Sequence, residues 1–124
     1  MAKYLSLEDL SSYKLALELS NYVWDIVVKW EYFEKKTVGE QFVRAADSIS
    51  ANIAEGFGRY GKKDKIKFYR YSLGSLSEVS DWIAKSIHRK LITEKQEKEM
   101  LKFSTQLPIE LYNLINFTNE KLKI

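Results

Sequence analysis

The side chains best suited to chemistry in this sequence are a single histidine and a few charged residues set within apolar helical patterns. His88 is the only histidine and the chain has no cysteine, so disulfides and thiolate metal sites are excluded. A di-iron helical bundle needs Glu-x-x-His pairs on facing helices, whereas the residue three positions before His88 is Lys85. We therefore expect no catalytic residues, no metal and no cofactor, with His88 on the surface near a helix end.

Glu78, which the helical pattern predicts on the inner face of the third helix, is the remaining candidate for acid–base chemistry. A buried carboxylate has to be paired or protonated, and the second predicted helix offers Arg44 or Asn52 as its partner. Glu78 could be an active-site carboxylate or part of a polar clamp that aligns the two helices. We favour the clamp, because no second catalytic group accompanies Glu78. Its predicted members are Arg44, Ser48, Asn52, Glu55, Ser75 and Glu78.

A basic cluster follows the second predicted helix, with a single acidic residue, Asp64, among its members. The basic residues are Arg59, Lys62, Lys63, Lys65, Lys67 and Arg70, and the interleaved tyrosines are Tyr60, Tyr69 and Tyr71. Basic groups attract phosphates and aromatic faces stack on exposed bases, so the cluster predicts a nucleic-acid interface, with RNA the favoured ligand. The alternative is a solvated helix start whose tyrosines lie in the core. Repetition around a ring would add weak contacts by multivalency.

Helical periodicity predicts the elements that position these residues as residues 7–30, 37–57, 63–89 and 93–122. The chain has five glycines and one proline, which is typical of long helices with few connections. The predicted capping residues are Ser6, Thr37 with Glu40, and Thr93 with Gln96. Short connections place sequential helices antiparallel. We expect one all-α domain over residues 1–124, folded as an antiparallel up-down four-helix bundle.

The first predicted helix is apolar over most of its surface. Its polar residues recur at steps of three and four and form one narrow stripe, Lys14, Glu18, Asn21, Asp25 and Lys29. A surface helix of a monomer needs an apolar stripe of only ~100° or somewhat more. We therefore expect another subunit to cover part of this helix.

The second and third predicted helices have distinguishable faces. In the second helix, the apolar face holds Phe42, Ala46, Ile49 and Ile53. A further face holds mostly small residues, Val43, Ser50, Ala51, Ala54 and Gly58, which would let another helix approach closely. In the third helix, the predicted inward face holds Phe68, Tyr71, Ser75, Glu78, Trp82 and Ser86.

Composition sets few limits on the partners and location of the protein. A net charge of +3 permits an acidic partner without requiring one. No apolar run approaches the ~20 residues that span a bilayer, and Met1–Tyr4 leads into a polar helix start rather than a targeting signal. The absence of cysteine fits a reducing compartment. We expect a cytoplasmic protein with no membrane segment.

The segment Arg44–Arg59 reads RAADSISANIAEGFGR. It closely resembles the signature of the four-helix-bundle family of the 23S rRNA intervening-sequence protein. Gly74–Glu78 is similar to that family's second motif, and Asp9-Leu10 and Gln41 also match. The resemblance covers nearly the whole chain. One position departs from the pattern, because Leu73 stands where the family usually has a basic residue.

The resemblance implies a bacterial up-down bundle that assembles as a ring-shaped homopentamer and has no enzymatic activity. A similar fold serves as the accessory protein of diversity-generating retroelements, where it binds nucleic acid and a reverse transcriptase. Residues and resemblance together predict a non-enzymatic homo-oligomer that binds RNA or DNA through Arg59–Arg70. The alternative is a scaffold or accessory subunit that binds another protein, such as one encoded nearby, and no nucleic acid.

Overall fold

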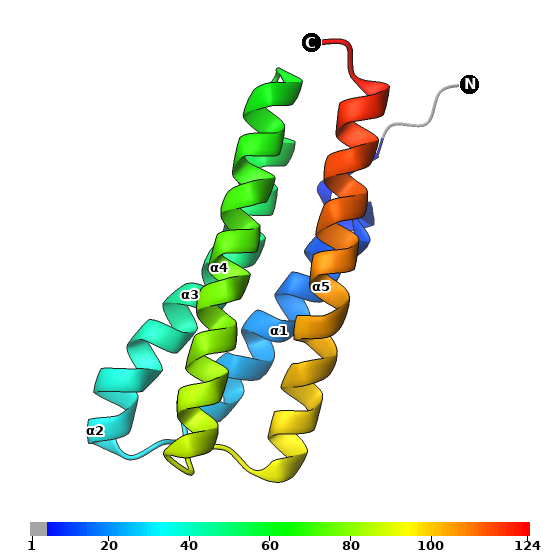
Figure 1. Cartoon of the computed structure of the whole chain (residues 1–124). Coiled ribbons are helices and arrows are strands. Elements are labelled where there is room, and N and C mark those ends of the chain that lie inside the picture. Colours follow the sequence, from blue (N-terminus) through cyan, green and yellow to red (C-terminus); the bar gives the residue numbers. More distant parts are fainter. Residues whose placement is uncertain (1–4) are drawn as a thin grey trace.

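The computed structural model describes residues 5–124, so the prediction about a targeting signal in Met1–Tyr4 lies outside the described residues. Within residues 5–124 all regular structure is helical, and four long helices dominate it (Figure 1). In chain order the elements are η1 (Leu7–Asp9), α1 (Ser11–Val27), α2 (Tyr32–Glu34), η2 (Lys35–Gly39), α3 (Glu40–Phe57), α4 (Lys62–His88) and α5 (Glu94–Lys121). The structure is therefore all-α and fits a four-helix bundle.

Each long helix packs mainly against two others. Helix α1 contacts α3 and α5, and α4 contacts the same two helices, so α1 and α4 lie diagonally across the bundle. Figure 1 shows the C-terminus at the same end of the molecule as the start of α4. A backbone hydrogen bond from the Lys62 N–H to the Ile124 carbonyl joins these two segments.

The predicted apolar face of the second helix is confirmed. Phe42, Ala46, Ile49 and Ile53 are all fully buried in the centre of the core. They pack with aliphatic residues of the other three long helices, including Leu19, Val23, Val79, Leu107 and Leu111. At roughly 1.5–3 kcal/mol for each large side chain, this burial supplies the main driving force for folding.

The predicted inward face of the third helix is wrong by one residue, a rotation of about 100°. The buried residues of α4 are Tyr69, Ser72, Leu76, Val79, Ile83 and Ser86. Of the predicted inward face only Ser86 is among them, and Tyr71 and Glu78 are exposed. Tyr71 is 52% exposed. The predicted stripe and the buried stripe are adjacent on the helix, and both repeat with helical spacing. The prediction chose the stripe with more aromatic residues, which is not the one that faces the core. Apart from Tyr69, the buried side of α4 consists of aliphatic residues and serines, and the Ser72 hydroxyl donates to the Ile49 carbonyl of the neighbouring α3 at 2.8 Å.

The predicted start of the second long helix at Thr37 is also wrong. The helical path begins at Tyr32 and continues through η2, a π-helical turn, into α3. The Thr37 hydroxyl donates to the Phe33 carbonyl at 2.7 Å, which is a hydrogen bond of a residue inside a helix rather than of an N-cap. The predicted capping box of Thr93 and Gln96 is confirmed.

Gly56 allows the tightest approach between α3 and α4. A Cβ atom at this position would lie 2.9 Å from the Lys65 carbonyl oxygen and 2.7 Å from Cε1 of Tyr69. Neither distance is tolerated by a real side chain, and a backbone carbonyl cannot move as a flexible side chain does. Glycine at this position therefore brings the start of α4, with its basic residues, against the end of α3.

Candidate interaction surfaces

The described residues contain no group of side chains arranged as a metal site. In residues 5–124 no three or more His, Cys, Asp or Glu side chains gather closely enough to hold an ion. His88 is exposed and is the last residue of α4, which agrees with its predicted position. None of the helices in this part of the chain is long and apolar enough to cross a bilayer.

The predicted polar clamp does not form between α3 and α4. Glu78 is exposed, and its carboxylate accepts a hydrogen bond from Nε1 of Trp82, one turn along α4, at 3.2 Å. Arg44 is exposed, and Asn52 donates to the Ser48 carbonyl at 2.9 Å. The one-residue rotation of α4 explains the error, because it turns Glu78 away from the core and towards solvent.

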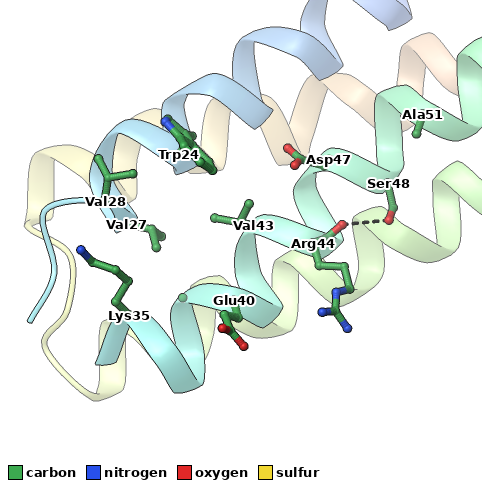
Figure 2. A pocket seen from close by; sticks show the side chains of 11 residues that line it. Trp24, Val27, Val28, Lys35, Glu40, Val43, Arg44, Asp47, Ser48 and Ala51 are labelled. Carbon is green, nitrogen blue, oxygen red and sulfur yellow. Dashed lines mark hydrogen bonds between the residues drawn. The ribbon is translucent and has the colours of Figure 1, made fainter. Parts of the chain in front are cut away.

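The other clamp residues also bond within their own helices. The Ser48 hydroxyl donates to the Arg44 carbonyl at 2.8 Å, as Figure 2 shows. Glu55 pairs with Arg59 at 3.1 Å, and Ser75 is half-buried on α4. These contacts satisfy local polar groups without holding the two helices together, since exposed pairs contribute only ~0–1 kcal/mol. Between α3 and α4, the Ser72 hydroxyl instead donates to the backbone carbonyl of Ile49, a residue of the signature.

Two members of the basic cluster are engaged by acidic and aromatic neighbours. Arg59 pairs with Glu55 and lies 3.8 Å from the Asp64 carboxylate, while Lys67 lies 3.2 Å from the same carboxylate. Both cations also sit over the ring of Phe68, at 4.6 and 5.2 Å from its centroid. Their charges are therefore partly neutralised within the chain.

Lys62 and Lys65 bind the carboxyl ends of neighbouring helices. Nζ of Lys65 donates to the Phe57 carbonyl at 2.7 Å, and Nζ of Lys62 donates to the Asn119 carbonyl at 3.1 Å. The last carbonyls of a helix lack partners in the helix and carry its negative dipole end. Basic residues at the start of α4 are thus stabilising, because the ends of α3 and α5 lie beside them. Partial burial lowers the pKa of Lys65.

The remaining members of the cluster are oriented towards solvent. Lys63 and Arg70 are exposed, and neither forms an ion pair within residues 5–124. The tyrosines divide between surface and core: Tyr60 is 83% exposed, whereas Tyr69 is fully buried. Burial raises the pKa of Tyr69 to about 12. The structure thus leaves a smaller accessible set, Lys63, Arg70, Tyr60 and Tyr71, than the sequence pattern implies.

An uncovered apolar groove lies beside the signature, between α1 and α3. We call it the α1/α3 groove; it has a volume of about 570 Å³. Figure 2 shows Trp24 and Val28 on one side of it and Val43 and Ala51 on the other. The charged residues at its edge are Lys35, Glu40, Arg44 and Asp47. Trp24 is 54% exposed, so a large aromatic surface borders the groove without being covered.

The groove could be predicted only in part. Two sequence features indicated close packing. The first helix is apolar over most of its surface, and the second has a face of small residues that includes Val43 and Ala51. Which of these surfaces the chain covers itself depends on how far apart α1 and α3 lie. One contact across them, from the Ser20 hydroxyl to the Asp47 carboxylate, was missed. The capping roles of Lys62 and Lys65 were missed too, although both follow closely on the glycines that end α3.

Comparison with known proteins shows the same fold in a solved structure. This is a protein of unknown function from the S23 ribosomal protein family of Bacteroides thetaiotaomicron, with a TM-score of 0.76 and 24% sequence identity. The match covers 84% of this chain and 97% of that one, and at this identity it establishes the fold alone. No curated protein matches the chain significantly.

The sequence also matches a family model, described as 23S rRNA-intervening sequence protein, over residues 8–116. The matched segment contains α1, α3 and α4 in full and most of α5. It includes both motifs on which the resemblance was based, Arg44–Arg59 and Gly74–Glu78. The chain therefore belongs to the 23S rRNA-intervening sequence protein family.

Proposed function

We propose that this chain is a non-enzymatic protein that self-associates through the α1/α3 groove. The observation that carries the proposal is the uncovered apolar surface formed by Trp24, Val28, Val43 and Ala51. Burial of apolar surface contributes roughly 25 cal/mol per Å², and exposed apolar patches bordered by charges commonly mark contacts with other chains. Coverage by another copy would also explain why α1 is apolar over most of its surface.

The proposed subunit is an antiparallel up-down bundle. Short connections, residues 58–61 and 89–93, support this arrangement. So does the hydrogen bond between Lys62 and Ile124, because it places the start of α4 beside the end of α5. Five subunits in a ring is the stoichiometry that the family resemblance implies.

Sedimentation velocity over a wide range of protein concentrations tests self-association. The wild-type chain is expected to form an oligomer, and Ala51→Arg is expected to dissociate it, because the long side chain would occupy the groove and its charge would lose water on assembly. Gln41→Arg is the matched control, since it adds the same charge to an exposed position of α3 outside the groove. A wild-type chain that remains monomeric, or equal assembly of the two variants, would contradict the proposal.

Nucleic-acid binding is a second candidate function, favoured by the exposed set Lys63, Arg70, Tyr60 and Tyr71. Two cations and two aromatic faces at one end of α4 suit contacts with phosphates and unpaired bases. A single chain offers few such contacts, whereas an oligomer would repeat them. RNA is the favoured ligand, because its unpaired bases are those most open to stacking.

Fluorescence anisotropy with single-stranded RNA and DNA of the same sequence tests this candidate. We expect affinity to fall with increasing salt, and Lys63→Gln/Arg70→Gln to weaken binding and to flatten the salt dependence by roughly 1–2 units of slope. Lys14→Gln/Lys29→Gln removes the same charge from α1 and from the turn that follows it, and is expected to change little. Equal binding by the two double variants, or no binding by the wild type, would reject the candidate. In the latter case, co-purification of a stoichiometric protein without nucleic acid would favour the scaffold alternative.

A further inference from the structure

Helix α5 carries a second uncovered apolar surface, distinct from the groove. Leu101, Ile109 and Tyr112 are 46%, 50% and 51% exposed. With the exposed Thr105 they follow steps of four, four and three residues, which place them along one side of a helix. We call this stripe the α5 face. It contains no charged residue.

Ile109 and Tyr112 lie on the part of the α5 face that points away from α1, whereas Leu101 and Thr105 border a hollow shared with Leu15 and Glu18 of α1. The side of α5 that packs on α1 is marked by Phe103, whose ring centroid lies 6.2 Å from that of Tyr22. Glu110, which accepts a hydrogen bond from the Ser11 hydroxyl at 2.6 Å, lies on the same side. Tyr112 comes nine residues after Phe103, a rotation of about half a turn. Because α5 packs on α1 and α4 while the groove lies between α1 and α3, the two surfaces occupy different sides of the bundle.

The shapes of the two surfaces are complementary. The groove is a hollow between two helices, floored by Val27, Gly39 and Val43, and two hollows placed together would leave the floor of each uncovered. The α5 face is the ridge of one helix, and helices pack by placing such ridges into grooves at axis separations of about 8–10 Å. A groove from one copy can therefore be filled by an α5 face from another.

The charges agree with this pairing. The edge of the groove carries two cations, Lys35 and Arg44, and two anions, Glu40 and Asp47, so its formal charge sums to zero. A phosphate backbone or an anionic lipid surface would gain little from such an edge. Lys98 and Lys102 lie beside Leu101 and Thr105, so Ile109 and Tyr112 are the part of the α5 face that can enter the groove without burying an ion, which is the costly step in forming an apolar contact.

We propose that the α1/α3 groove of one copy receives the α5 face of the next copy, so that the contact is heterologous. This inference rests on the proposed self-association and adds which surfaces meet. A heterologous contact leaves one groove and one α5 face free at the ends of every open chain of subunits. Such an assembly grows as a filament or closes as a ring, and it does not stop at a symmetric dimer.

Mixing two variants that are blocked on opposite surfaces tests the pairing. Ala51→Arg blocks the groove and Ile109→Arg blocks the α5 face. Each variant alone is expected to associate roughly 100-fold or more weakly than the wild type, because a long charged side chain would separate the two apolar surfaces and lose its water in the contact. A 1:1 mixture is expected to form a heterodimer and nothing larger. The Ala51→Arg chain contributes the intact α5 face and the Ile109→Arg chain the intact groove, and one contact uses both.

Three outcomes separate this pairing from the proposal on which it rests. A wild-type chain that stays monomeric in sedimentation velocity would reject self-association itself. A wild-type oligomer whose size Ile109→Arg does not change, or variants that stay monomeric when mixed, would reject the pairing alone. Far-ultraviolet circular dichroism confirms that each variant is folded; if one is not, Trp24→Ser or Tyr112→Ser replaces it, because both side chains are more than half exposed, at 54% and 51%.

Discussion

On its α4 side, helix α3 carries Gly56, and the two helices approach so closely that no Cβ atom fits between them. On its α1 side, the same helix carries Val43 and Ala51, which border an open groove. Both sides of α3 carry small residues. On the α4 side the chain's own helix fills the space beside them, whereas on the α1 side the groove stays open. The α3/α4 contact, which we call the closed seam, explains part of the family signature as packing within the subunit. The open groove leaves the rest of it available for the proposed contact with a second copy.

Filling Gly56 is expected to damage the closed seam most. Gly56→Ala should lower the free energy of unfolding by about 3 kcal/mol, because the added methyl group meets the backbone of α4 and forces the helices apart. The improved helix propensity of alanine offsets only part of this loss. Gly58→Ala is the matched control, since its Cβ would have no neighbour nearer than 3.7 Å. Urea denaturation measures both, and an equal effect of the two substitutions would mean that the seam is not closed as described.

Deprotonation of Tyr69 should loosen the same seam in alkali. The buried phenol keeps its proton up to a pKa of about 12 in the folded chain, whereas the unfolded chain releases it near pH 10. The folded state therefore binds more protons between these values, and stability falls as the pH rises through this window, by about 2 kcal/mol in total. Tyr69→Phe should remove this component from urea denaturation curves recorded between pH 9 and 12. Tyr71→Phe, on the exposed side of α4, should leave it in place.

Hydrogen bonds across the two sides of α3 should differ in strength. Ser72 is fully buried and donates to the Ile49 carbonyl in the closed seam, so Ser72→Ala should cost about 1 kcal/mol. Ser20 donates to Asp47 beside the groove. Ser20→Ala should cost less, about 0.5 kcal/mol, because the exposed Asp47 carboxylate regains water.

Ser86→Ala provides the control for these serines. Its hydroxyl is buried without a hydrogen-bond partner in the described part of the chain, so its removal should leave stability unchanged or slightly higher. Thermal unfolding of Ser72→Ala, Ser20→Ala and Ser86→Ala gives the order of their stability losses directly. A larger loss for Ser20→Ala than for Ser72→Ala would reverse the assignment of closed and open sides.

The difference between the two sides marks the limit of what the sequence predicts. Helical periodicity identified four long helices, the Thr93–Gln96 capping box marked the start of α5, and Phe42, Ile49 and Ile53 correctly marked the core face of α3. The orientation of α4 could not be settled in this way, because its aromatic and aliphatic stripes lie one residue apart and only the approach of α3 decides between them. That error placed Glu78 in a clamp. The contacts of Lys62 and Lys65 with helix ends could not be predicted either, since their partners are carbonyls that only the folded chain brings near.

Gly74 tests whether the outer surface of α4 is as free in the assembled protein as it is in one subunit. A Cβ atom at this position would meet nothing within 4 Å, in contrast to Gly56. Gly74→Ala should therefore raise stability by about 0.7 kcal/mol, the gain in helix propensity alone. Measured in the Ala51→Arg background, where assembly is blocked, the gain reports on the isolated subunit. If the same substitution weakens association in the wild-type background, the space beside Gly74 is occupied by a second chain, and this part of α4 is a subunit contact rather than a free surface.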